Sequence, residues 1–331
     1  MRALVILGAT VLVALIGYVA MFAVKPAVSR PVVGEHARAE IDALGERLMR
    51  HVRVLGGRVG ERNLFRPDAL HAAAEHIRQA WSEQGFSVTS EAYDVAGQRC
   101  ANLFVEHRGS SRAHEIVVVG AHYDSVVGSP GANDNATGVA ILLEMSSLLS
   151  ATSLPRTLRL VAFVNEEPPL FATEHMGSRR HARNARARGD QIVAMISLET
   201  LGYYSDGPSS QRYPFPLGVL YPSTGNFLGV VGNLGSRSLV RDLLRYLMEA
   251  TDFPVEGAAT FAWLPGVDWS DHGSFWKEGY RAVMLTDTAL YRYPHYHSAE
   301  DRPEEINAAE FARAAHGIIK AVQRLASGPS G

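Results

Sequence analysis

The sequence predicts an α/β fold: a three-layer sandwich with a mostly parallel mixed central sheet and helices on both faces. Three observations carry this prediction. Short apolar runs rich in β-branched residues recur along the chain, and such runs are typical of buried strands. Segments with helical spacing of apolar residues alternate with these runs. The chain has 331 residues, 47% hydrophobic and 20% charged, which is enough for one large globular domain.

An uncharged run of 22 residues, Ala3–Val24, opens the chain between Arg2 and Lys25. A membrane-spanning helix needs about 20 such residues, and the core of a signal peptide only about 7–15. We therefore expect residues 1–30 to form a signal anchor, that is, a transmembrane helix with a short linker. A cleaved signal peptide stays open as the alternative, with Ala27-Val28-Ser29 as its cleavage site.

No later segment of the sequence is apolar enough to span a membrane, so we expect residues 31–331 to form a single domain outside the cytoplasm. That domain would be periplasmic or extracellular if the anchor is kept, and secreted if it is cleaved. The formal net charge of −2 gives no reason to expect a nucleic acid partner. The single cysteine, Cys100, excludes an intrachain disulfide and a cysteine-rich zinc cluster. Its strand-like neighbours favour a buried apolar role for it.

The predicted elements alternate along the chain as an α/β sandwich requires. Helices are predicted over 37–52, 66–84, 139–149, 173–188, 238–249 and 303–325. Strands are predicted over 86–92, 100–106, 115–120, 158–164, 192–198 and 282–285. Two long segments, 202–225 and 251–273, are predicted to be ordered loops. Loops of that length in a compact domain usually belong to a functional site.

Side chains that bind metals follow the apolar strands. The run Val117-Val118-Val119 leads to His122 and Asp124, and the carboxyl edge of an α/β sheet is where such proteins place their sites. A glycine-containing loop then supplies Asp134 just before the 139–149 helix. Taken alone, His122-x-Asp124 is also compatible with an ordinary polar turn at a strand end. The residues further along the chain decide between these interpretations.

Further carboxylates end the next strands. Glu166-Glu167 follows the strand at 158–164, and Glu199 ends the strand after the next helix. Two adjacent carboxylates are costly to bury unpaired, and a cation would explain them. Side chains of neighbouring residues diverge, so one can bind a metal while the other faces water on the substrate side. His297 supplies a second imidazole, with His295 as its rival.

Together these positions make a mixed set of nitrogen and oxygen ligands on strand ends and on the loops that follow them. Such a set suits zinc, or cobalt or manganese as substitutes. A carboxylate that bridges two ions would give a two-metal site with the ions about 3.5–4 Å apart. The sequence therefore predicts zinc, with two ions per chain.

The order of these motifs resembles the zinc-dependent aminopeptidases of the bacterial leucyl aminopeptidase type. This family also includes glutaminyl cyclases and the ectodomains of glutamate carboxypeptidase and transferrin receptor. The resemblance covers roughly residues 35–325. The motifs that carry it are His122-x-Asp124, Gly131-Ala132-x-Asp134-Asn135-Ala136-x-Gly138, Glu166-Glu167, Glu199, His297 and the segment Ser270-Asp271-His272-Gly273-Ser274-Phe275.

The resemblance implies a role for each of these residues. Glu166 would be the general base and later the general acid, and Asp124 would hold the second ring nitrogen of His122. The ligands would be His122 and Glu167 on one zinc, Glu199 and His297 on the other, and Asp134 between the two. Asp271, His272 and Tyr296 would lie near the substrate or behind the ligands. The family often has aspartate where this chain has Glu199, and the longer side chain could weaken the second metal position.

We therefore expect a metallo-aminopeptidase that hydrolyses N-terminal residues of peptides with a metal-activated water, and with Glu199 near the free α-amine. A glutaminyl cyclase and a non-catalytic ectodomain that kept the fold are the alternatives, and another exopeptidase specificity stays open. Loop aromatic residues are candidates for a side-chain pocket, although ordinary packing explains any single one better: Tyr203, Tyr204, Phe261, Trp263, Trp269, Phe275 and Tyr296.

Overall fold

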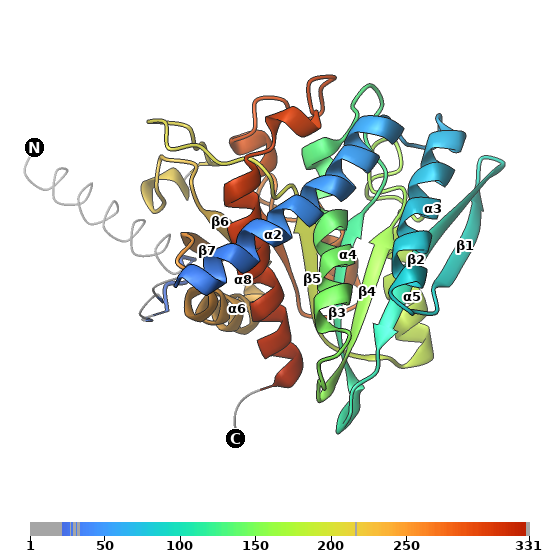
Figure 1. Cartoon of the computed structure of the whole chain (residues 1–331), viewed down its shortest axis with the longest axis horizontal. Helices are drawn as coiled ribbons and strands as arrows, with labels where there is room; N and C mark the ends of the chain where they lie inside the picture. Colours follow the sequence, from blue (N-terminus) through green and yellow to red (C-terminus); the bar gives the residue numbers. More distant parts are fainter. Residues whose placement is uncertain (1–21, 27, 29–30, 32–33, 216, 329–331) are drawn as a thin grey trace, which may run out of the picture.

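The computed structural model describes residues 22–26, 28, 31, 34–215 and 217–328, and an eight-stranded sheet forms its centre (Figure 1). The strand order is β1-β2-β4-β3-β5-β8-β6-β7. The strands are β1 (Thr89–Val95), β2 (Gln98–His107), β3 (Arg112–His122), β4 (Arg156–Phe163), β5 (Gln191–Glu199), β6 (Leu228–Asn233), β7 (Val255–Thr260) and β8 (Ala282–Thr286).

The four central strands are parallel. β3 pairs with β4 on one side and with β5 on the other, and β5 pairs with β8. β2 and β6 join this core antiparallel, so the sheet is mixed and mostly parallel, as predicted. Because parallel strands end at the same edge, His122 lies beside Phe163 of β4, and Glu199 lies beside Thr286 of β8. The residues that follow these strands are therefore neighbours.

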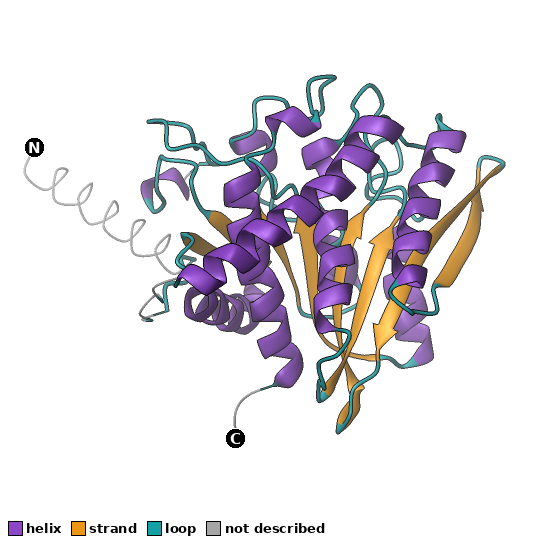
Figure 2. Ribbon diagram, viewed as in Figure 1, coloured by secondary structure: helices purple, strands orange, loops and turns teal. Residues whose placement is uncertain are grey.

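Helices cover both faces of the sheet, which confirms the three-layer prediction (Figure 2). In β3, Val117 and Val119 pack into the larger apolar cluster on one face, whereas Ile116 and Val118 pack into the cluster on the other. Such two-sided burial explains the continuous apolar runs in the sequence. The larger cluster involves α2 (Glu35–Val52), α3 (Pro67–Glu83), α4 (Thr137–Leu149), α6 (Arg237–Ala250) and α8 (Ala308–Ser327), and the smaller involves α5 (Gly177–Arg188) and α7 (His272–Lys277).

Two strands were not predicted, β6 and β7, which pair parallel at one end of the sheet. The expectation of a continuous loop over 251–273 is therefore wrong for the part that forms β7. Both strands contain glycines that admit close packing: a Cβ on Gly257 would lie 2.1 Å from Leu244 of α6, and one on Gly232 would lie 2.7 Å from Val240. Glycine is depleted in strands, so these segments lack the usual strand signal.

The predicted membrane helix lies almost entirely outside the described residues. Its described end, Phe22–Val24, is not helical. Val24 donates its amide to the carbonyl of Gly257 at 3.0 Å, Ala259 donates to the carbonyl of Phe22 at 3.0 Å, and Ala23 bridges to Ala258. The prediction of a helix through Val24 is thus wrong in its last residues, because the edge of β7 offers these residues backbone partners. Among the described residues, no helix has the length and apolarity needed to cross a membrane.

Candidate metal centre

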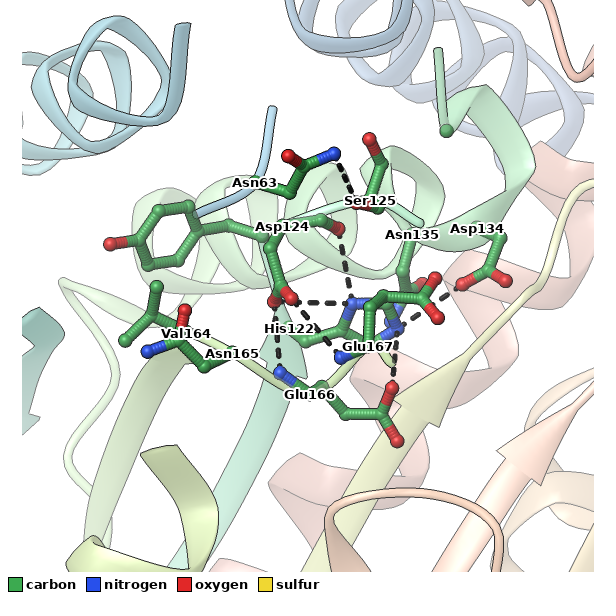
Figure 3. Close-up of polar contacts among 12 residues, drawn as sticks. Asn63, His122, Asp124, Ser125, Asp134, Asn135, Val164, Asn165, Glu166 and Glu167 are labelled. Carbon is green, nitrogen blue, oxygen red and sulfur yellow. Dashed lines mark hydrogen bonds and ion pairs between the residues drawn. The ribbon is translucent and has the colours of Figure 1, made fainter. Parts of the chain in front are cut away.

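The strand ends bring the predicted metal-binding side chains together at the carboxyl edge of the sheet. Figure 3 shows four of these residues: His122, Asp134, Glu166 and Glu167. His122 ends β3, Glu199 ends β5, and Glu166 and Glu167 follow β4 after a two-residue turn. Asp134 lies in the short helical segment η2 (Ala132–Ala136) that leads into α4. His297 comes from the loop after β8. All of these side chains except His297 are buried.

Asp134 lies between the two imidazoles. One of its carboxylate oxygens is 3.2 Å from Nε2 of His122, and the other is 3.1 Å from Nε2 of His297. Glu199 approaches the same nitrogen of His122 at 3.5 Å, and Glu167 approaches that of His297 at 3.2 Å. Two groups therefore share Asp134, one with His122 and Glu199 and the other with Glu167 and His297.

The family resemblance implied another pairing, with His122 and Glu167 on one ion and Glu199 and His297 on the other, and this pairing stays a prediction. The shortest contacts join His122 to Glu199 and His297 to Glu167. His122 also forms a group with Glu166 and Glu167, so its imidazole lies between the carboxylates that follow β4 and the one that ends β5. Strand order is the reason, because β3 lies directly between these two strands.

Glu166 is held apart from the bridging carboxylate. Its nearest imidazole nitrogen is Nε2 of His122, at 3.9 Å, and Figure 3 shows its carboxylate directed away from that of Glu167. The two side chains diverge, as expected for adjacent residues. Both glutamates form a group with His122, but among the described residues only Glu167 also forms one with Asp134 and His297. Glu167 is therefore the candidate ligand, and Glu166 is the candidate for proton transfer.

Asp124 positions this glutamate pair. Its carboxylate accepts the backbone amides of Glu166 at 3.2 Å and of Glu167 at 3.1 Å. The predicted contact with the ring of His122 is longer, since Nδ1 lies 3.7 Å from the Asp124 carboxylate. That nitrogen instead lies 3.2 Å from the backbone carbonyl of Asp124. Asp124 thus orients His122 through its main chain and the glutamates through its side chain.

The turns that present these residues adopt left-handed backbone conformations. Asn165, just before Glu166, has φ of 62°; Thr200, just after Glu199, has φ of 44°; His297 itself has φ of 56°. Residues other than glycine rarely adopt such values, and each costs of order 1–3 kcal/mol. Backbone strain of this kind clusters at functional sites, where the fold must orient particular side chains.

The glutamates of the centre hold protons unusually tightly, whereas contacts with His122 and His297 outweigh burial and lower the pKa of Asp134. Burial and the neighbouring Asp134 raise the pKa of Glu167 to about 7, although His297 opposes this. Burial also raises the pKa of Glu166 well above its usual range, and the negative charges of Glu199 and Glu167 add to the effect. Conversely, the pKa of His297 rises to about 10 because contacts with Asp134 and Glu167 outweigh its burial. The site is therefore built for more positive charge than its own side chains supply.

The donor set fits a metal ion. Nδ1 of His122 is placed to donate to a backbone carbonyl, which leaves Nε2 as a bare acceptor. This nitrogen and the facing Oδ1 of Asp134 are both buried and have no hydrogen-bond partner among the described residues. Two acceptors 3.2 Å apart repel unless a proton or a metal ion lies between them. The surrounding carboxylates, Glu199 first, outweigh burial and raise the pKa of His122 well above its usual range, so this position favours a positive charge. Tetrahedral zinc with bonds of about 2.0–2.2 Å separates its ligands by roughly 3.3–3.6 Å, close to the spacings seen here.

Three residues to which the sequence gave no role of their own support the centre. Asp301 accepts the amides of Asn133 at 2.7 Å and Asp134 at 3.1 Å, and so fixes the bridging residue. Ser270 donates to Glu199 at 2.7 Å. Arg62, fully buried, donates from its guanidinium to five backbone carbonyls, which belong to Leu55, Gly60, Tyr123, Pro130 and Gly131. Single polar residues in loops carry no periodic pattern, so sequence reasoning missed them.

The three residues predicted near the substrate or behind the ligands, Asp271, His272 and Tyr296, differ in their distance from the centre and in their contacts. Asp271 is fully buried close to the charges of His122 and Glu199, and burial raises the pKa of its carboxyl to about 7. Tyr296 stacks on the ring of His297 with centroids 3.9 Å apart. His272 instead donates to the carbonyl of Val267 at 2.7 Å and contacts Trp276, so its expected place near the substrate is not supported by its contacts.

The predicted rival of His297 lies outside the centre. His295 pairs with Glu305 at 3.4 Å, on the far side of the loop that carries both histidines. His297, not His295, therefore completes the group with Asp134 and Glu167.

A largely apolar cavity of about 100 Å³ adjoins the centre, and Glu199 and Tyr296 contribute to its wall. Strands β6, β7 and β8 form its floor with Val231, Ala258 and Met284. The long loops predicted at 202–225 and 251–273 supply much of the rest, including Tyr213, Leu217 and Trp269. Of the predicted pocket aromatics, Trp269 and Tyr296 line this cavity, whereas Phe275 packs into the core.

The chain is similar in sequence to known peptidases and to other proteins. Residues 102–322 match the profile of Peptidase family M28. The chain is 36% identical over 284 residues to the uncharacterized protein YfbL of Escherichia coli K12, covering 83% of this chain and 86% of that protein. It is 24% identical over 244 residues to a probable leucine aminopeptidase of Arthroderma otae, covering 69% of this chain and 58% of that protein. The chain thus spans a little over half of the fungal relative.

Solved structures share the fold. The LapA aminopeptidase of Legionella pneumophila superposes with a TM-score of 0.66 at 16% identity, over 92% of this chain and 79% of LapA. The glutaminyl cyclase of Fimbriiglobus ruber superposes with a TM-score of 0.61 at 18% identity, over 90% of this chain and 99% of the cyclase. At these identities the superpositions establish the architecture.

Proposed function

This chain belongs to peptidase family M28, and we propose that it is a zinc-dependent aminopeptidase that removes N-terminal residues from peptides. The observation that carries the proposal is the pair of ligand groups joined by Asp134, with the carboxylate of Glu166 beside them and outside both. The ligands alone would fit a structural metal. The Glu166 carboxylate, which lies beside the ligands without belonging to either group, is placed to act as a general base in hydrolysis.

We propose that the centre holds two zinc ions. His122 and Glu199 would hold one ion, Glu167 and His297 the other, and Asp134 would contact both. Zinc in such a site polarises a carbonyl oxygen and lowers the pKa of a coordinated water. Each group offers three side-chain ligands, which leaves room for water or substrate at a four-coordinate ion.

Glu166 is the residue placed to move protons in this proposal. Its buried carboxylate has a raised pKa, so it can take a proton from water and later release it to the leaving amine. Asp124 holds the backbone on both sides of the Glu166–Glu167 peptide bond, which fixes the direction of this carboxylate. General base catalysis needs such fixed geometry before it needs a tuned pKa.

The apolar cavity fits the side chain of the residue that is released. It begins at Glu199 and Tyr296, next to the ligands, and continues over the apolar surface of β6, β7 and β8. A side chain that enters it leaves the adjacent carbonyl at the metal centre. The size and apolar lining of the cavity favour leucine, methionine or an aromatic side chain over a charged one.

We further propose that the segment before Phe22 anchors the protein in a membrane, with the described domain outside the cytoplasm. The uncharged length of Ala3–Val24 in the sequence supports this proposal. Secretion after cleavage is the alternative. Protease added outside intact cells or spheroplasts should digest an anchored protein that stays with the membrane fraction, whereas a cytoplasmic protein would be protected.

A glutaminyl cyclase is the second candidate, because a solved cyclase shares the fold. Cyclases form pyroglutamate from N-terminal glutamine and release ammonia, whereas an aminopeptidase releases amino acids. The cyclase alternative accounts less well for two complete ligand groups, since the family resemblance gives cyclases a single zinc.

The experiment that tests the proposal combines metal analysis with a digest. The purified full chain is loaded with zinc, its zinc content is measured, and it is incubated with a library of unblocked peptides and with the same peptides acetylated at the N-terminus. We expect stepwise loss of N-terminal residues from unblocked peptides only. Cleavage of the acetylated set, or pyroglutamate as the main product, would refute the aminopeptidase assignment.

A further inference from the structure

The described chain starts beside an exposed apolar surface at the β7 end of the sheet. The ring of Phe22 contacts Phe261 edge-on with centroids 5.2 Å apart, and Phe261 stacks on Trp263 at 5.5 Å. Trp263 is 73% exposed. Tryptophan has the bulkiest side chain, and so large an exposed fraction of it is unusual on a surface that contacts only water.

Neighbouring segments extend this surface. Leu234 follows β6 as Phe261 follows β7, and the last residues of these strands are paired, so the two side chains leave the sheet side by side. Leu234 is 47% exposed and Val219 is 71% exposed. Leu220, next to Val219, lines a recess together with Ala23, Val24, Lys25, Pro26, Arg237 and Arg241. We define the β7-end surface as Val219, Leu234, Trp263, Lys25 and Arg241.

We propose that the β7-end surface lies against a lipid bilayer that carries anionic headgroups. This inference rests on the proposed membrane anchor. Twenty-one residues precede Phe22, and from Ala3 onward they are uncharged. Backbone hydrogen bonds join Phe22–Val24 to β7. An anchor that ends at Phe22 would therefore have no flexible linker between it and this surface. A membrane that holds the preceding segment must therefore approach Trp263.

The composition of the surface matches an interfacial region. Tryptophan is enriched where membrane meets water, because its ring is apolar and its N–H is polar. Lys25 and Arg241 are exposed at the rim, where cations attract anionic headgroups. The loop that carries Trp263 also carries Trp269, which lines the side-chain cavity.

Quenching of tryptophan by brominated lipid tests this proposal. The full chain is reconstituted into vesicles of phosphatidylcholine and phosphatidylglycerol, with brominated or ordinary acyl chains, and flotation establishes how much protein is bound. The chain has four tryptophans, and Trp81 is fully buried in α3. We expect brominated lipid to quench wild-type emission and Trp263→Phe to abolish most of that quenching. Trp276→Phe, which changes a partly buried ring in α7, is the matched control and should preserve it.

The remaining outcomes each overturn the proposal. Quenching in Trp263→Phe that equals the wild type, or no quenching in protein that floats with the vesicles, would show that this surface faces water. A stable dimer in detergent that Trp263→Ser dissociates would assign the surface to a second copy. Failure to float would remove the anchor and this inference together. Peptidase activity measured in detergent does not depend on these results, so it tests the proposed function separately.

Discussion

Replacing Arg62 should weaken both the fold and the metal centre, although this residue contacts no predicted ligand directly. Its guanidinium donates to the carbonyls of Tyr123 at 2.6 Å and Gly131 at 2.8 Å, on the chain between His122 and Asp134. Burial lowers the pKa of Arg62 to about 10, so it remains charged at neutral pH. It thus supplies a fixed positive charge behind the acidic centre.

The expected magnitude follows from these contacts. Arg62→Met leaves five buried or partly buried carbonyls without their donor and removes a buried charge, and losses of this kind cost about 3–5 kcal/mol in the free energy of unfolding. Arg62→Lys keeps the charge but loses the planar fork of donors, so it should recover only part of the loss. Because the loop to Asp134 loosens, zinc affinity should fall by roughly 10–100-fold.

Urea unfolding of the metal-free protein and zinc titration against a competing chelator measure these two effects. Arg66→Met is the matched control, because Arg66 is an exposed neighbour whose contact with Glu61 is 3.6 Å long. Its free energy of unfolding should stay within about 0.5 kcal/mol of the wild type. The reasoning is refuted if Arg62→Met keeps the wild-type unfolding midpoint and a zinc affinity within about threefold of the wild type.

Three further predictions concern the site, the pH response and specificity. Glu166→Gln should retain zinc but lower kcat by about 10²–10⁴-fold; full activity of the zinc-loaded variant would remove Glu166 from the chemistry. Burial lowers the pKa of His272 to about 4, so between pH 6.5 and 4 only the unfolded chain binds this proton, and the free energy of unfolding should lose roughly 3 kcal/mol as the pH falls. Urea titrations at both pH values measure this change, and the free energy of unfolding of His272→Gln should fall by less than that of the wild type. An equal fall in both proteins would contradict the prediction. Val231→Phe narrows the cavity at its floor, so kcat/KM should fall at least about tenfold more for phenylalanyl anilides than for alanyl anilides. Equal reductions for the two substrates would show that the substrate side chain binds elsewhere.

The central strands were predictable because burial on both faces leaves a strong signal. The runs at 115–120, 158–164, 192–198 and 282–285 all lie inside or largely overlap β3, β4, β5 and β8. The strands β6 and β7 gave no such signal. Gly229 and Gly232 interrupt the first, and the second combines Glu256 with Gly257, so tertiary pairing decides their structure.

The gathering of the candidate ligands at one sheet edge was predictable from the sequence, but their nearest neighbours there were not. Each ligand ends a strand or follows one, so its place at the sheet edge follows from the strand pattern alone. The partners depend on strand order and on the turns at Asn165 and Thr200, whose left-handed conformations no local rule requires. The strand pattern therefore does not say whether Glu167 or Glu199 lies nearer to His122. Residues such as Arg62 act through main-chain carbonyls, and their role depends entirely on the folded loops.

The balance of charge links the stability of the centre to its chemistry. Glu167 and Asp271 each have a pKa raised to about 7 by burial, so side chains alone do not keep every carboxylate of the site ionised. Divalent cations would supply the missing charge and release the protons from the ligands. Glu166 has the same buried surroundings but lies outside both ligand groups that share Asp134. If its neighbours bind metal ions, Glu166 is the carboxylate that would keep a proton to exchange, because burial and the negative charges of Glu199 and Glu167 raise its pKa.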